Sequence, residues 1–124
     1  MDFVSFVALL ALIEYLAFSI MTGRARGAYG VKAPAITGHP MFERWYRVQM
    51  NTLEQLVVFL PALFLFARYV SPRWAALLGL VFVVGRAIYA RSYLADPESR
   101  SLGFGLSFVP TILLLLGAVL AVIF

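Results

Sequence analysis

Residues 42–59 read FERWYRVQMNTLEQLVVF, and they place charged side chains in a segment that is otherwise apolar. The polar members recur in steps of three and four residues, which puts them on one stripe of a helix: Arg44, Arg47, Asn51 and Glu54. A charge deep in a bilayer costs about 2.5–3.5 kcal/mol on insertion scales, so such groups usually face protein and usually serve a function. This stripe is therefore the first candidate site.

The composition indicates an integral membrane protein. Of 124 residues, 63% are hydrophobic and 13% are charged, and the mean hydropathy is +0.92, whereas about half of a soluble domain is apolar. Four apolar stretches of about 20 residues are each long enough to cross the ~30 Å hydrocarbon core. We therefore predict an all-α fold, an antiparallel up-down four-helix membrane bundle. It forms a single domain over residues 1–124, with helices at about 3–22, 41–68, 73–94 and 97–123.

The first apolar stretch is interpreted as a retained helix, because it lacks a preceding basic region and a following small-residue cleavage site. Its Glu14 lies near mid-membrane, and two interpretations stay open: a proton or cation site, or a carboxyl group hydrogen-bonded to a neighbouring helix. The helix is expected to end at Thr22–Arg24. A loop with the helix breakers Gly27 and Gly30 should follow and continue to Pro40.

Proline and capping residues predict the later helix starts. Pro72 suits the first turn of the third helix, and Asp96 can cap a fourth helix with Pro97 in its first position. Arg100 would then lie in the opening turn of the fourth helix. Antiparallel order brings the start of the second helix, the end of the third and the start of the fourth to one membrane face.

Basic residues favour one orientation of the chain. Eight of the ten Lys and Arg residues lie in or near the first and third loops: Arg24, Arg26, Lys32, Arg44, Arg47, Arg86, Arg91 and Arg100. Only Arg68 and Arg73 lie near the second loop. By the positive-inside rule, loops one and three are cytoplasmic and both termini are on the other side. The basic residues form no stripe with stacking aromatics, so we expect membrane lipids and not nucleic acid as a partner.

The polar residues predicted at the cytoplasmic face suit a small anionic zwitterion. Arginine forks bind carboxylates at two points, and Glu54 can hold an ammonium group. Positive charge with tyrosine hydroxyls would also lower the pKa of a bound thiol. The chain has no cysteine, so the thiol must come from a substrate. His39 is the only histidine and is expected to cap a turn, so no metal site is predicted.

Three blocks of sequence resemble the MAPEG family, the membrane-associated proteins of eicosanoid and glutathione metabolism. They are FERWYRVQMNTLE at 42–54, GRAIYARSY at 85–93 and DPESRSLGF at 96–104, in the family's order and with matching gaps. The resemblance implies a four-helix protomer, a homotrimer, and glutathione as co-substrate, held between protomers near the cytoplasmic face.

The resemblance also implies roles for individual residues. The positions that match glutathione contacts are Arg26, Arg47, Asn51, Glu54, Arg86, Tyr89 and Tyr93. Arg100 matches the arginine proposed to stabilise the glutathione thiolate and is the expected catalytic residue. Two positions depart from some members: Gly27 stands where they carry a second catalytic arginine, and Gln55 where they have a tyrosine.

Simpler interpretations accompany these roles. Arg44, Arg91 and Lys32 are expected to contact lipid headgroups or solvent, and Tyr89 and Tyr93 alone would fit an interfacial aromatic belt. The leading hypothesis is a glutathione S-transferase acting on hydrophobic electrophiles from the bilayer, with glutathione peroxidase activity on lipid hydroperoxides left open. The alternatives are a noncatalytic lipid-binding protein and a small proton-coupled multidrug transporter that uses Glu14.

Overall fold

The computed structural model describes residues 2–124, and four long helices account for most of them. The elements in order are α1 (Asp2–Ala28), α2 (Pro40–Tyr69), α3 (Pro72–Ala95), the short 3₁₀ helix η1 (Pro97–Ser99) and α4 (Ser101–Ile123). Each long helix is long and apolar enough to cross a membrane. The described residues contain no strand. The predicted all-α four-helix membrane bundle is therefore confirmed.

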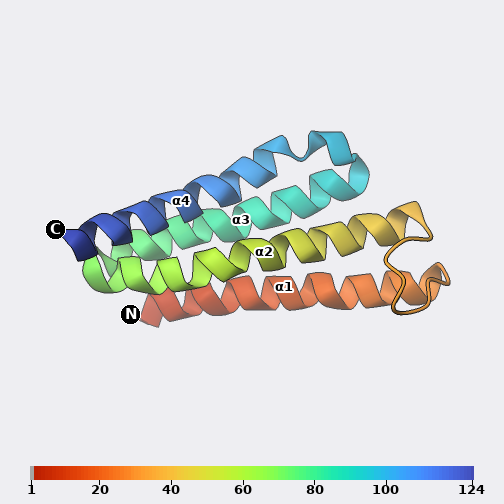
Figure 1. Ribbon diagram of the computed structural model, residues 1–124, viewed down its shortest axis with the longest axis horizontal. Coiled ribbons are helices and arrows are strands. Elements are labelled where there is room, and N and C mark those ends of the chain that lie inside the picture. Colours follow the sequence, from red (N-terminus) through yellow and green to blue (C-terminus); the bar gives the residue numbers. More distant parts are fainter. Residues whose placement is uncertain (1) are drawn as a thin grey trace.

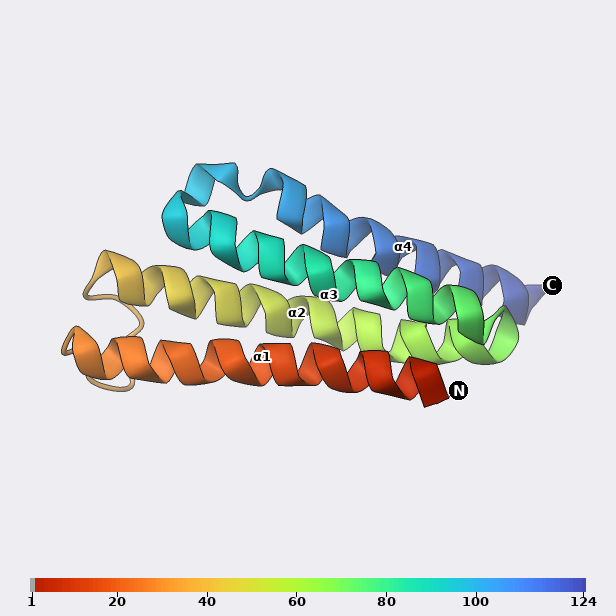
Figure 2. The same ribbon diagram turned by 180° about the vertical axis from the view of Figure 1, so that it is seen from behind.

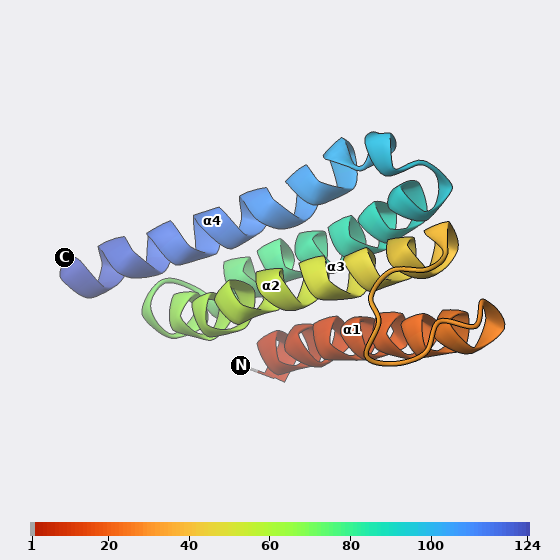
Figure 3. The same cartoon turned by 45° about the vertical axis from the view of Figure 1, so that its right-hand side comes forward.

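The helices run antiparallel and give the bundle two distinct ends (Figures 1 and 2). Both termini and the α2–α3 turn lie at one end, which we call the terminal end. The α1–α2 connection and the α3–α4 connection lie at the other, which we call the loop end. Helix α1 packs against α2 and α3, and α4 packs against the same pair from the other side (Figure 3).

Apolar side chains fill the centre of the bundle and also cover its outside. Phe59 of α2 and Phe82 of α3 stack with ring centroids 3.8 Å apart, next to fully buried Leu63. On the outer surface, side chains such as Leu9 of α1 and Leu120 of α4 are more than half exposed. A continuous apolar exterior is the expected surface of a protein that contacts lipid tails.

Helix α1 continues past the predicted end at residues 22–24, so that prediction was wrong. Thr22 is buried, and its hydroxyl donates to the carbonyl of Phe18 at 2.8 Å within the helix. Gly27 lies inside the helix and does not break it. The chain turns only at Gly30, whose φ of +67° is favourable for glycine. Arg26 consequently lies in the last turn of α1.

The start of the fourth helix also differs from its prediction. Asp96 does act as a cap, because its side chain accepts a hydrogen bond from the Glu98 backbone N–H at 3.1 Å. The capped segment, however, is the single turn η1, and α4 begins only at Ser101. Arg100 therefore lies at the junction between the two helices and not within a continuous opening turn.

Arg44 ties two helices together at the loop end, a contact that its expected role at lipid headgroups or solvent did not include. Its Nη1 donates to the carbonyl of Leu94 at 2.7 Å and to that of Ala95 at 3.4 Å. These are carbonyls of the last turn of α3, which have no partner within the helix. The contact fixes the start of α2 against the end of α3, beside the candidate site.

Candidate functional site

A pocket of about 600 Å³ lies at the loop end, between α2, α3 and α4. Its lining residues are Arg47, Asn51, Tyr89, Tyr93, Arg100, Ser101, Phe104 and Gly105. Five of the eight predicted site residues are among them. The lining set has two guanidinium groups and no carboxylate, so the pocket is positively charged. Its volume is in the range of small-molecule sites.

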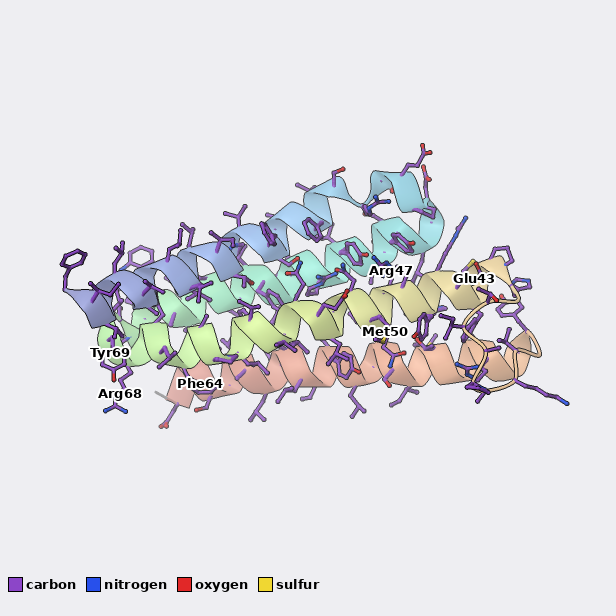
Figure 4. All side chains as sticks on the ribbon, viewed as in Figure 1. Glu43, Arg47, Met50, Phe64, Arg68 and Tyr69 are labelled. Carbon is purple, nitrogen blue, oxygen red and sulfur yellow. The ribbon has the colours of Figure 1, made fainter. Side chains whose placement is uncertain are left out.

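Helix α2 supplies Arg47 and Asn51, one turn apart on the stripe predicted from the sequence. Figure 4 shows Arg47 on the half of α2 toward the loop end, while Arg68 lies at the opposite end of the same helix. Arg47 is exposed and Asn51 is half-buried. An exposed guanidinium at the pocket wall keeps its donors available for a carboxylate.

Helix α3 supplies two stacked tyrosines. The rings of Tyr89 and Tyr93 are 5.6 Å apart between centroids and inclined by 19°. Tyr89 is almost fully buried because α4 approaches it closely at Gly103: a Cβ at that glycine would lie 2.3 Å from the Tyr89 backbone nitrogen. The absent side chain at Gly103 thus lets α4 pack directly on the tyrosine wall.

Arg100 enters the pocket from the junction of η1 and α4. Its Nη1 donates to the carbonyl of Pro97 at 3.0 Å, and the residue is exposed. One donor thus holds the side chain to its own turn, and the rest of the guanidinium is free to face the pocket. The arrangement can stabilise an anion such as a thiolate.

Arg86 lies behind the pocket wall and not in its lining. It is fully buried, and its Nη2 donates to Oδ1 of Asn51 at 2.8 Å. Its guanidinium carbon is also 4.2 Å from the centroid of the Tyr89 ring. Arg86 therefore orients two lining residues, Asn51 and Tyr89, within the single chain.

Glu54 lies outside the pocket, in a groove between α2 and α4. The groove has a volume of about 360 Å³ and shares Asn51 and Phe104 with the pocket. Apolar side chains, among them Phe108 and Leu115, form much of its remaining wall. The pocket therefore adjoins an apolar groove in the membrane-spanning part of the bundle, and Glu54 lines that groove.

Arg26 is the one predicted site residue that the single chain places apart from the others. Its Nη1 donates to the carbonyls of Ala35 at 2.7 Å and Val31 at 3.4 Å. Its guanidinium also lies 4.6 Å from the centroid of the Phe42 ring. In this chain Arg26 holds the α1–α2 connection in place.

Nearby, His39 Nδ1 accepts from the Met41 backbone N–H at 3.1 Å, which confirms its capping role.

Sequence reasoning missed three lining residues, Ser101, Phe104 and Gly105. All three lie in the first turns of α4, directly after Arg100. Helical spacing from Arg100 points to Phe104, four residues on. The signal for the two small residues is weaker, because Ser and Gly at a helix start usually reflect local backbone needs.

The sequence over residues 4–120 matches the MAPEG family. This chain belongs to the MAPEG family. Among similar proteins, an uncharacterised protein of Synechocystis is 48% identical over 117 residues, covering 94% of this chain and 85% of that protein. Human microsomal glutathione S-transferase 2 is 37% identical over 113 residues, covering 90% and 77%. Leukotriene C4 synthase of Cavia porcellus is 38% identical over 94 residues, covering 76% and 63%. The pocket of this MAPEG chain thus lies within the matched residues.

Proposed function

We propose that this chain is a membrane-embedded glutathione transferase that conjugates glutathione to hydrophobic electrophiles. The observation that carries the proposal is the positively charged pocket, lined by Arg47 and Arg100, that adjoins an apolar groove. A water-soluble anionic thiol suits the pocket, and a bilayer-soluble electrophile suits the groove. The names of two relatives, a microsomal glutathione S-transferase and leukotriene C4 synthase, support the same class of chemistry.

The proposed roles follow the chemistry of each side chain. Arg47 pairs with a glutathione carboxylate, Glu54 with its ammonium group, and Asn51 with either. Tyr93 donates a hydrogen bond from the tyrosine wall. Arg100 stabilises the thiolate by its positive charge.

Glutathione, the electrophile and water supply every group that reacts in the conjugation step. The glutathione thiol loses its proton to solvent, and the thiolate sulfur attacks the electrophilic carbon to form a C–S bond. The leaving group departs with its bonding electrons, or an opened ring takes up a proton from water. In the peroxidase reaction left open from the sequence, the thiolate would attack the terminal hydroperoxide oxygen, and the departing alkoxide would take up a proton from water to give an alcohol. A second glutathione then forms the disulfide, with loss of water.

The proposal includes the homotrimer that the family resemblance implies. Glu54 is exposed on a single chain, and so are Val58 and Phe108 along the same α2–α4 groove. A neighbouring protomer would cover these apolar side chains and enclose the groove. A monomeric mass measured by light scattering in detergent would contradict this part of the proposal.

A matched pair of arginine variants tests the function. Arg47 and Arg68 lie on the same helix, near its opposite ends (Figure 4). Loss of a hydrogen bond to a charged substrate group costs about 1.5–3 kcal/mol, so Arg47→Ala should weaken glutathione binding about 10- to 150-fold. Arg68→Ala should bind glutathione as the parent does. Calorimetry in detergent measures binding, and absorbance with an aryl halide electrophile measures conjugation.

Three other outcomes would each change the conclusion. Glutathione binding without turnover across a panel of electrophiles and hydroperoxides would favour the noncatalytic lipid-binding alternative. Absence of glutathione binding by the parent would reject the proposal itself. Equal binding by the Arg47 and Arg68 variants would show that the site is misplaced.

A further inference from the structure

A second cavity with a basic side chain lies at the terminal end of the bundle, opposite the end that holds the candidate pocket. It is a cleft of about 320 Å³ between α1 and α3, which we call the terminal cleft. Its lining residues are Phe3, Val4, Pro72, Arg73, Ala76 and Leu77. Five of these six side chains are apolar, and Arg73 carries the only charge among them. The cleft therefore combines one guanidinium group with an apolar wall.

The position of the terminal cleft along the helices puts it at a membrane surface. Arg73 and Leu77 lie in the first two turns of α3, and a rise of 1.5 Å per residue puts Leu77 only about 8 Å from the start of that helix. Trp74 and Tyr69 are exposed at this end, and Figure 4 shows Tyr69 there beside Arg68. Exposed aromatic side chains are typical of the membrane interface. Arg73 is therefore at the depth of lipid headgroups, with apolar surface below it.

The terminal cleft opens on the outside of the bundle. Phe3 and Leu77 are 57% and 43% exposed, whereas Val4 and Ala76 are buried and form its floor. Helix α1 packs on the α2–α3 pair from one side and α4 from the other, so the α1–α3 cleft and the α2–α4 groove lie on opposite faces (Figure 3). A molecule in the terminal cleft would thus contact neither the candidate pocket nor its groove.

The two arginines of the terminal end have different surroundings. The guanidinium of Arg68 lies 5.2 Å from the centroid of the Tyr69 ring and does not line the cleft. Arg73 lines the cleft and follows Pro72 in the first turn of α3, where the positive end of the helix dipole adds to its charge. Asp2 is exposed and does not line the cleft. Only one of the two basic side chains is thus joined to an apolar cavity.

We propose that the terminal cleft is a binding site for an anionic phospholipid. Arg73 binds the lipid phosphate, since a guanidinium group bonds to phosphate oxygens at two points. The first part of one acyl chain lies between α1 and α3, over Val4 and Ala76. A headgroup without an ammonium group keeps its net negative charge, so basic residues at a membrane surface favour it over a zwitterionic headgroup. This site is independent of the proposed glutathione chemistry.

The test uses the fluorescence of Trp74, which is exposed and directly follows Arg73. The chain has two tryptophans, so a full-length Trp45→Phe protein reports from Trp74 alone. In phosphatidylcholine vesicles, phosphatidylglycerol and phosphatidylcholine with the same brominated acyl chains are compared as quenchers. We expect an apparent affinity about fivefold higher for phosphatidylglycerol, equivalent to about 1 kcal/mol for one basic residue. Adding Arg73→Ala should bring the ratio to about one.

Arg68→Ala in the same Trp45→Phe protein is the matched control, because it removes an equal charge from the same end of the bundle. Its preference for phosphatidylglycerol should stay within about twofold of that of the protein with both arginines. Equal losses in the Arg68 and Arg73 variants would show attraction by diffuse surface charge and overturn the site. Inorganic phosphate at matched ionic strength should not relieve the quenching. Relief by phosphate would indicate a site for a free anion and reject the phospholipid.

The remaining outcomes also decide the inference. Equal quenching of Trp74 by the two brominated lipids would overturn it. If the Trp45→Phe protein does not fold, the parent and Arg73→Ala, each with both tryptophans, are compared instead, and the expected loss of quenching by phosphatidylglycerol is the same. Calorimetry should give one glutathione affinity for the parent and Arg73→Ala. A failed lipid site would therefore leave the proposed function intact, and a failed proposed function would leave the lipid site.

Discussion

The arginines at the loop end divide by what their guanidinium groups contact. Arg44 bonds to carbonyls at the end of α3, Arg26 to carbonyls of the α1–α2 connection, and Arg86 to Asn51 inside the bundle. Arg47 and Arg100 line the pocket. Of these five guanidinium groups, only those of Arg47 and Arg100 belong to the pocket lining. The residue type is the same in every case, and the surroundings decide its role.

Arg100 should act on the thiolate more than on binding. A cation beside the sulfur favours the charged form and lowers the pKa of the bound thiol, so the thiolate is present at lower pH. Arg100→Ala should therefore raise that pKa toward the ordinary thiol value of about 8.5. A rise of one to two units reduces conjugation at neutral pH about 10- to 100-fold, while glutathione affinity stays close to that of the parent. The measurement is the absorbance of bound thiolate as a function of pH.

Two further variants define this result. Arg100→Lys should recover only part of the effect, because a flexible ammonium does not reproduce the planar guanidinium. Arg91, an exposed arginine of α3 that does not line the pocket, provides the control. Arg91→Ala should titrate as the parent does. Coincident curves for Arg100→Ala and the parent would remove Arg100 from the thiolate role.

At the scale of elements, the close contact of α3 and α4 determines the shape of the pocket. Two glycines make this approach possible, one on each helix. A Cβ at Gly85 would lie 2.7 Å from the Leu106 backbone, and a Cβ at Gly103 would lie 2.3 Å from that of Tyr89. Small residues at helix contacts are a general means of packing in membranes. Here they bring Tyr89 and Arg100 to the same pocket.

Gly103→Ala should therefore weaken both stability and glutathione binding. The added methyl group meets backbone atoms that cannot move aside, so α4 must shift, and overpacking of this kind costs about 1–3 kcal/mol.

Gly23→Ala in α1 is the control, because nothing lies within 4 Å of a Cβ there. It should keep or raise the melting temperature, since alanine favours helix. Thermal unfolding in detergent with and without glutathione tests both variants. An unchanged Gly103→Ala protein would contradict this account of the contact.

Sequence patterns predicted the elements better than their ends. Hydropathy alone predicts the four helices, because each must hide its backbone from lipid. The predicted end of α1 was wrong because Arg26 and Gly27 are residue types that are typical of a loop. In the structure, the buried Thr22 bonds within α1 and to α2 and keeps that stretch helical. The stripe containing Arg47 and Asn51 followed from helical spacing. The burial of Arg86 depends on packing between helices, which spacing within one helix does not report.

At the scale of the whole molecule, the polar and apolar surfaces are segregated along the bundle axis. The pocket, Arg26, Arg44 and the two connections of the loop end are polar. The middle of the bundle exposes apolar side chains. Under the proposed function, a hydrophobic electrophile would reach the α2–α4 groove from the bilayer, and glutathione would reach the pocket from water. The proposed function therefore requires glutathione on the side of the loop end, which ties it to the orientation in the membrane.

The expected orientation puts the loop end in the cytoplasm, and the absence of cysteine from the sequence makes it directly testable. Single cysteines at exposed positions provide the labels: Lys32→Cys in the α1–α2 connection, Glu98→Cys in η1 and Val70→Cys in the α2–α3 turn. Because four antiparallel spans put the first two on one side, they should react alike with a membrane-impermeant maleimide, and the third should react oppositely.

In intact cells we expect labelling of Val70→Cys alone, since the positive-inside rule keeps the basic loops inside. Labelling after lysis controls for accessibility. Labelling of Lys32→Cys and Glu98→Cys in intact cells would reverse the orientation, and different behaviour of these two positions would contradict the antiparallel bundle itself.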